Sequence, residues 1–142
     1  MNVNAEIDTS SLDAHFKRLG SQFSKDIAKG LAATAERGIG VILDRTAKGR
    51  GYKAPFPAYT PQYAKFRAKK GRSTSPDLNF SGKMTGSMRS KVNAPELTAE
   101  IYFSRAAEAK KAVANNRKRP FFGFNNIEKN RLTRWFYRYL KI

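Results

Sequence analysis

The side chains that most often carry acid–base or metal chemistry are few and scattered in this sequence. His15 is the only histidine among the 142 residues, and there is no cysteine. His-based triads, His pairs for a metal and thiolate sites are therefore excluded. The acidic residues stand singly, with no spacing that suggests a working carboxylate pair. Gly49-x-Gly51 lacks the downstream Gly-Lys-Ser/Thr of a phosphate-binding loop. We therefore expect no enzymatic activity, no metal and no cofactor.

Positive charge is the chemistry that the sequence does carry. Residues 45–76 contain nine Lys and Arg side chains and no acidic one. Residues 1–44 hold five basic and six acidic side chains, a net charge of −1, and residues 45–142 hold 23 and five, a net charge of +18. The +17 of the whole chain therefore comes from its last two thirds, and this region needs an anionic partner or a well-solvated surface.

Lysines and arginines interleaved with aromatic residues could bind phosphate groups and stack on bases. A basic face that is merely solvated, or that meets an acidic protein, would show the same pattern. The residues that we expect to face DNA or an acidic partner are Lys48, Arg50, Lys53, Lys65, Arg67, Lys69, Lys70, Arg72, Arg117, Lys118 and Arg119.

Length and composition predict a single domain over residues 1–142. The 17 aromatic residues argue against wholesale disorder, although a mean hydropathy of −0.62 permits disordered loops. We expect mobile basic loops at residues 46–58 and 71–77, which are rich in Gly, Pro, Ser or Thr. The first residues show no secretory signal, and no apolar run is long enough for a membrane span. We expect synthesis in a cytoplasm and a soluble product.

Apolar periodicity predicts an α+β fold. Residues 3–7 alternate like a short strand, and residues 12–42 repeat apolar side chains every three or four positions, which predicts a long helix with one buried face. Gly30, in the middle of this stretch, suggests a break into two helices. Residues 88–92 and 98–103 predict a hairpin, which would form a small antiparallel sheet under the long helix.

Short helices are expected between and after these elements. Thr60-Pro61 predicts an N-cap followed by Pro at the first helical position. Residues 80–88 read as a turn of helix, and residues 105–115 as another short helix. Asn125 or Asn126 would cap an amphipathic C-terminal helix whose apolar face comprises Ile127, Leu132, Trp135, Phe136 and Tyr139.

Three short blocks of sequence together carry a resemblance. The first runs from Phe56 to Gly71 and contains Phe-Pro-Ala-Tyr-Thr-Pro-Gln-Tyr-Ala-Lys-Phe followed by Lys69-Lys70-Gly71. The second is Asp-Leu-Asn-Phe-Ser-Gly-Lys-Met-Thr-Gly-Ser-Met (77–88). The third is Arg-Pro-Phe-Phe-Gly-Phe (119–124), just before the predicted last helix. In this order and spacing the set resembles the tail-completion and neck proteins of tailed bacteriophages, the virion morphogenesis group, and the related small head–tail joining proteins.

The resemblance implies a non-enzymatic structural protein of the virion. Such a subunit would form a ring in the neck, between the portal or its adaptor and the tail terminator or tail tube, where it could contact packaged DNA non-specifically. It would have no membrane partner. The alternative is a sequence-independent nucleic-acid-binding protein. Under the first hypothesis, the residues of the subunit seam or fold motif are Phe56, Tyr59, Tyr63, Phe66, Met84, Met88, Phe121 and Phe122.

Overall fold

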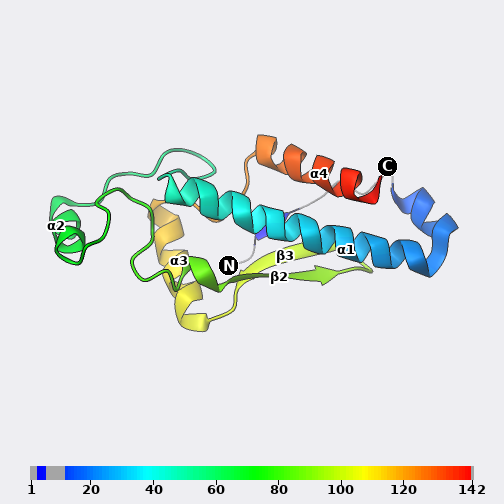
Figure 1. The fold of residues 1–142 in the computed structure, drawn as a ribbon, viewed down its shortest axis with the longest axis horizontal. Helices are drawn as coiled ribbons and strands as arrows, with labels where there is room; N and C mark the ends of the chain where they lie inside the picture. The colour runs from blue at the N-terminus through cyan, green and yellow to red at the C-terminus, as the bar shows by residue number, and fades with distance from the viewer. Residues whose placement is uncertain (1–2, 6–11, 142) are drawn as a thin grey trace. The chain divides into compact units, whose positions relative to one another are not determined.

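The computed structural model describes the backbone of residues 3–5 and 12–141 and the side chains of residues 23–141. The elements are β1 (Val3–Ala5), α1 (Leu12–Ala47), α2 (Pro61–Lys69), the short 3-10 helix η1 (Thr85–Ser87), β2 (Met88–Asn93), β3 (Thr98–Phe103), α3 (Ala106–Lys118) and α4 (Asn126–Leu140) (Figure 1). The predicted α+β class is confirmed.

The sheet has the order β1-β3-β2, with β3 in the centre. β1 pairs antiparallel with β3 and places Val3 opposite Ile101 and Ala5 opposite Ala99. β2 and β3 form the predicted hairpin. Ala99, Ile101 and Phe103 are all buried, so alternate residues of β3 share the inner face, as the period of two requires. The two further residues predicted for the first strand lie outside the described residues.

The described residues group into two compact units. The first comprises Val41–Met88 and Phe103–Gly123. The second comprises the described parts of Asn2–Gly40, together with Arg89–Tyr102 and Phe124–Ile142. Each unit combines segments that are distant in the sequence. The single domain expected from the length stays a prediction.

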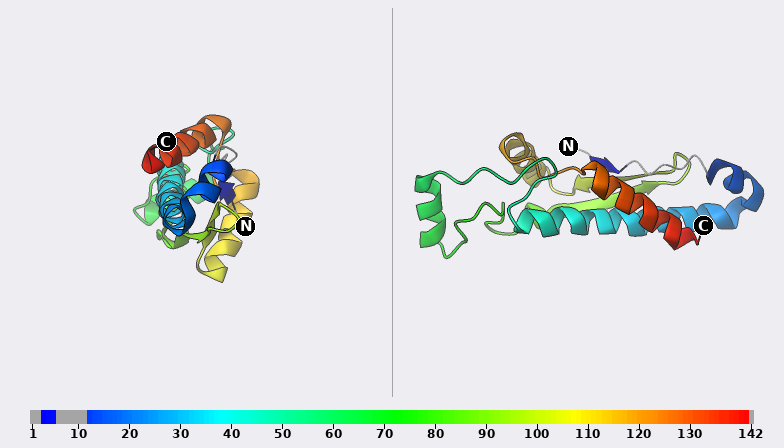
Figure 2. Two further views of the ribbon diagram at one scale, coloured as in Figure 1. Left: turned by 90° about the vertical axis from the view of Figure 1, so that its right-hand side faces the viewer. Right: turned by 90° about the horizontal axis from the view of Figure 1, so that it is seen from above.

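The second unit is built on α1. Phe23, Ile27, Leu31 and Ala35 follow one another at intervals of four, so they line one face of the helix, and they pack with Ala99 and Phe136. Burying each of the large side chains contributes about 1.5–3 kcal/mol. Figures 1 and 2 show the hairpin and α4 running beside this helix.

The break expected near Gly30 is not present, because α1 is one continuous helix. Gly30 instead provides space for α4. A Cβ atom at this position would lie 3.1 Å from ring carbons of Phe136 and Tyr139. The missing side chain allows the two helices to approach closely, and this packing offsets the low helix propensity of glycine.

α4 begins as expected but presents a narrower apolar face. The Asn125 side chain accepts a hydrogen bond from the Glu128 amide at 2.8 Å, and the Glu128 carboxylate accepts one from the Asn125 amide at 3.0 Å. This reciprocal pair is a capping box. Leu132 and Phe136 are buried, whereas Ile127 is 70 % exposed. Tyr139 is also 49 % exposed, so two of the five residues predicted for the apolar face of this helix are largely open to solvent.

Two other elements differ from expectation. The turn predicted at residues 80–88 is reduced to η1. Met88 begins β2, as predicted for the first strand of the hairpin. α1 extends to Ala47, so the first basic loop begins at Lys48. α2 has the predicted start, because the Thr60 hydroxyl accepts a hydrogen bond from the Tyr63 amide. Whether the basic loops are mobile stays a prediction.

Substitutions at two glycines of α1 test the packing in the second unit. Gly30→Val should lower the free energy of unfolding by about 1–3 kcal/mol, because the new side chain overpacks the contact with Phe136 and Tyr139. Gly40→Val is the matched control, since no atom lies within 4 Å of a Cβ there. It should change stability by less than about 0.5 kcal/mol. Urea unfolding followed by circular dichroism measures both, and equal effects would contradict the packing described.

Candidate functional site

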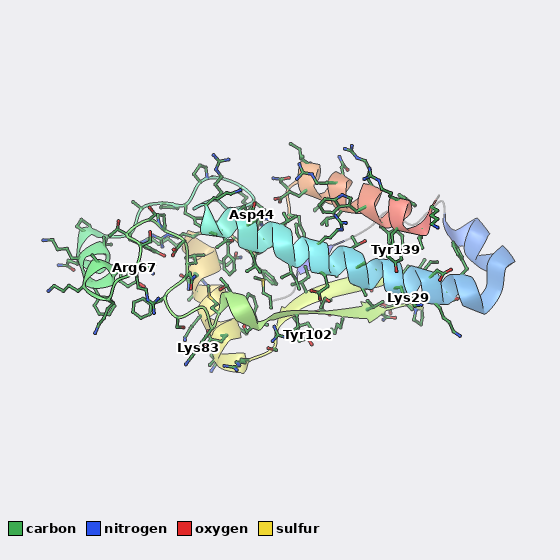
Figure 3. All side chains as sticks on the ribbon, viewed as in Figure 1. Lys29, Asp44, Arg67, Lys83, Tyr102 and Tyr139 are labelled. Carbon is green, nitrogen blue, oxygen red and sulfur yellow. The ribbon has the colours of Figure 1, made fainter. Side chains whose placement is uncertain are left out.

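The first unit contains an arginine that is almost fully removed from solvent. Arg67 projects from α2 and is only 1 % exposed (Figure 3). Its Nη2 donates to Asp77 Oδ1 at 2.8 Å and to the carbonyl oxygen of Asn79 at 3.0 Å. Its Nε donates to the carbonyl oxygen of Ser73 at 2.6 Å. One guanidinium group thereby bonds residues 73–79, which follow α2, to the helix.

A second buried arginine binds the segment that precedes α2. Arg119, which ends α3, is 6 % exposed. Its Nε and Nη2 donate to the carbonyl oxygens of Pro57 and Ala58, both at 2.9 Å. Arginine suits this role because its planar fork can serve two acceptors at once and is less strongly hydrated than an ammonium group.

Tyr59 lies between these two arrangements. The guanidinium carbon of Arg67 is 4.8 Å from the centre of the Tyr59 ring, and that of Arg119 is 4.6 Å away. The Tyr59 hydroxyl accepts a hydrogen bond from the Leu78 amide at 3.1 Å. One aromatic side chain therefore links α2, the end of α3 and the segment around Leu78.

The last turn of α1 is joined to the Phe-Phe-Gly turn in a similar way. Arg45 Nη2 donates to the carbonyl oxygen of Phe121 at 2.8 Å and also to that of Gly123. Asn116 Oδ1 accepts from the amides of Phe121 and Phe122 at 3.1 and 3.0 Å. The same turn approaches the first loop so closely that a Cβ atom on Gly51 would lie 2.1 Å from the carbonyl oxygen of Pro120. Only glycine fits there.

Beside the buried arginines lies a group of exposed aromatic rings. The rings of Tyr63 and Phe66 are 6.1 Å apart, and those of Phe66 and Phe80 are 5.8 Å apart and nearly parallel, at 6°. Tyr63 is 39 % exposed, Phe66 45 % and Phe80 37 %. We call these three residues the aromatic cluster.

The aromatic cluster forms one side of a cavity of about 530 Å³. Residues of α3, among them Glu108, Lys111 and Lys118, form the other side. Its volume falls within the range of about 300–1,000 Å³ that is typical of ligand pockets. Glu108 is buried, and its Oε1 accepts a hydrogen bond from Lys111 Nζ at 3.2 Å. Its Oε2 is buried and has no hydrogen-bond partner among the described residues.

The structure separates the predicted basic residues into two classes. Arg67 and Arg119 do not face outward as expected, because their guanidinium groups are engaged with backbone carbonyls and aromatic rings inside the unit. The other nine are exposed: Lys48, Arg50, Lys53, Lys65, Lys69, Lys70, Arg72, Arg117 and Lys118.

The eight residues predicted for the subunit seam or fold motif also differ in their exposure to solvent. Tyr59 is partly buried, and Tyr63 and Phe66 are exposed. The rings of Phe121 and Phe122 pack against Phe103, with centre distances of 6.4 and 4.8 Å. Five of the eight are buried: Phe56, Met84, Met88, Phe121 and Phe122.

Sequence reasoning missed the residues that connect distant segments, above all Arg45, Glu108, Asn116 and the exposed ring of Phe80. One signal was present, since arginine rather than lysine stands at positions 45, 67 and 119, and the last two lie within two residues of a phenylalanine. Arginine is preferred where several acceptors and a ring face must be satisfied together.

The described residues form neither a cluster of metal ligands nor a membrane-spanning helix. Among these residues, no three His, Asp or Glu side chains gather as metal ligands would. None of the described helices is long and apolar enough to cross a membrane. His15 lies outside the residues whose side chains are described.

Comparison with known proteins adds no relative. No protein-family model matches the chain, and no curated protein and no solved structure shows significant similarity to it.

Conservative replacement of a buried arginine tests the architecture of this unit. Arg67→Lys should lower the free energy of unfolding by about 1–3 kcal/mol, because an ammonium group cannot reach the acceptors on residues 73, 77 and 79 together. Arg72→Lys is the matched control at an exposed position and should change stability by less than about 0.5 kcal/mol. Chemical denaturation of both variants measures the difference, and equal stabilities would contradict the role assigned to Arg67.

Proposed function

We propose that this chain is a non-enzymatic structural protein of a tailed-bacteriophage virion. It would form a ring in the neck, complete the tail and join it to the head. Its neighbours would be the portal or adaptor protein on one side and tail terminator or tail tube proteins on the other. It would be made in the host cytoplasm and become part of the virion.

The observation that carries this proposal is that the three blocks of the resemblance meet in one unit. Arg119, from the last block, bonds to Pro57 and Ala58 of the first block. The amide of Leu78, in the middle block, donates a hydrogen bond to the Tyr59 hydroxyl of the first. Short motifs that matched a family by chance would have no reason to be hydrogen-bonded to one another. Their association supports treating the ordered set as one structural feature.

The positive charge of the exposed surface favours a second candidate function, the binding of nucleic acid. Nine of the predicted basic residues are exposed, and residues 45–142 carry a net charge of +18. Such a surface attracts nucleic acid without reading its sequence. In the virion hypothesis this surface faces packaged DNA or acidic neighbours. In the alternative, the free protein binds nucleic acid on its own.

Electron microscopy of purified virions of the encoding phage tests the proposal directly. We expect density for this chain at a symmetric position between head and tail. Mass spectrometry of the same particles should detect the chain in stoichiometric amount. Absence of the chain from assembled particles would refute the virion role, whatever the protein binds in solution.

Binding to random duplex DNA separates the two functions. The virion hypothesis predicts weak binding by the isolated subunit, whereas the alternative predicts tight binding that falls steeply as salt rises.

Removal of four exposed charges near α2 tests whether this surface is used in either function. Changing Lys65, Lys69, Lys70 and Arg72 together to Ser should impair particle assembly, or should reduce the salt dependence of DNA binding by about one for each phosphate group that is no longer neutralised. The matched control changes four exposed basic residues of the second unit to Ser, namely Lys25, Lys29, Lys129 and Arg134. Both variants lose the same charge. If neither differs from the parent in infectivity or DNA binding, the cations near α2 are only solvated.

A further inference from the structure

We propose that the cavity between the aromatic cluster and α3 is a docking site for an acidic protein segment that inserts an aromatic or aliphatic side chain. This inference goes beyond the virion hypothesis, which gives Tyr63, Phe66 and Met84 only to a subunit seam or fold motif and names no ligand for the cavity that they line. It rests on the cavity and its charges and does not depend on that role.

The cavity is suited to an apolar side chain. Its walls include Tyr59, Leu78 and Met84 in addition to the aromatic cluster. Three of the six large hydrophobic residues that are exposed in the described part of the chain belong to this wall. Exposed apolar groups gathered around a hollow are typical of interaction sites, whereas single exposed ones are ordinary.

The charges around the cavity select an acidic partner. Its lining contains four cationic residues and one acidic residue. Arg67 and Glu108 already have partners of opposite charge in Asp77 and Lys111. Lys118 has no acidic partner among the described residues and is exposed. Carboxylates on either side of an inserted apolar side chain would meet this excess of positive charge.

The geometry favours a protein segment over a nucleic acid. Stacking of bases requires free ring faces, but the rings of Phe66 and Phe80 stack on each other. Lys70 Nζ lies 6.0 Å from the centre of the Phe66 ring, and the Arg72 guanidinium lies 5.5 Å from that of Phe80. Part of each ring is therefore covered by the neighbouring ring or approached by a cation, which leaves less ring face for a stacked base.

Glu108 supports the same choice of partner. Its carboxylate in the wall would repel a phosphate group placed inside the cavity.

The test uses purified full-length protein and a fluorescein-labelled peptide, Glu-Glu-Trp-Glu-Glu, followed by fluorescence anisotropy. We expect binding with a Kd below about 1 mM. The peptide Glu-Glu-Ser-Glu-Glu should bind at least about tenfold more weakly, because it lacks the inserted ring. Lys-Lys-Trp-Lys-Lys should not bind. No binding of the acidic Trp peptide at about 1 mM, or equal binding of the Trp and Ser peptides, would overturn the proposal.

Substitutions of residues that line the cavity test whether the peptide binds there. Phe66→Ser and Phe80→Ser should each weaken binding of the Trp peptide about tenfold, and Lys118→Ser should weaken it roughly threefold. The first two residues are exposed, so both variants should fold, which circular dichroism checks independently. Ile127→Ser is the control at an exposed apolar residue outside the cavity and should bind like the parent. Equal binding by the parent and both Phe variants would overturn the assignment to this cavity.

A labelled single strand of oligo-dT completes the comparison. We expect that it does not displace the Trp peptide and that its own binding is unaffected by Phe66→Ser. If oligo-dT displaces the peptide and its binding also falls in both Phe variants, the cavity is a nucleic-acid site and the proposal is wrong. Because none of these measurements involves virions, the peptide result and the virion result can fail independently.

Discussion

The packing of two buried guanidinium groups on one tyrosine ring is the interaction on which the first unit depends. Arg67 and Arg119 both lie within 5 Å of the centre of the Tyr59 ring. Of these two arginines, only Arg67 has a carboxylate partner among the described residues, that of Asp77. Removing a cation from water is costly, and in Arg119 this cost is offset by two backbone carbonyls and the ring face. The arrangement therefore holds only while the chain segments that supply those acceptors stay in place.

This constraint gives the positive charge of the chain two separate roles. The buried arginines act inside the unit, where they join segments that have little regular structure of their own. Among the exposed cations, Lys70 and Arg72 lie beside the rings of the aromatic cluster, and Lys111 and Lys118 line the same cavity, so this surface carries an excess of positive charge. The fold and the proposed interactions thus depend on different cations, and a variant can remove one set while the other remains.

The sequence predicted the elements well where the signal was local. Periodicity identified α1 and the hairpin, and side-chain capping identified the starts of α2 and α4. Prediction from the sequence failed where the position of a residue depends on contacts with a distant segment of the chain. Gly30 suggested a helix break because the sequence does not show that α4 packs on it. Arg67 and Arg119 were predicted as surface cations because their carbonyl acceptors lie on other segments of the chain. The cavity was also beyond prediction, since Phe80 and Glu108 come together only through the tertiary fold.

A double-mutant cycle between Arg67→Met and Arg119→Met tests the central claim most directly. The two residues are 52 positions apart in the sequence, and Tyr59 is the group that both contact. Each single variant should be destabilised, and the double variant should lose less than the sum by about 1 kcal/mol, because the first substitution already releases Tyr59. Free energies of unfolding that add to within about 0.3–0.5 kcal/mol would show that the two arginines act independently, which would contradict the account.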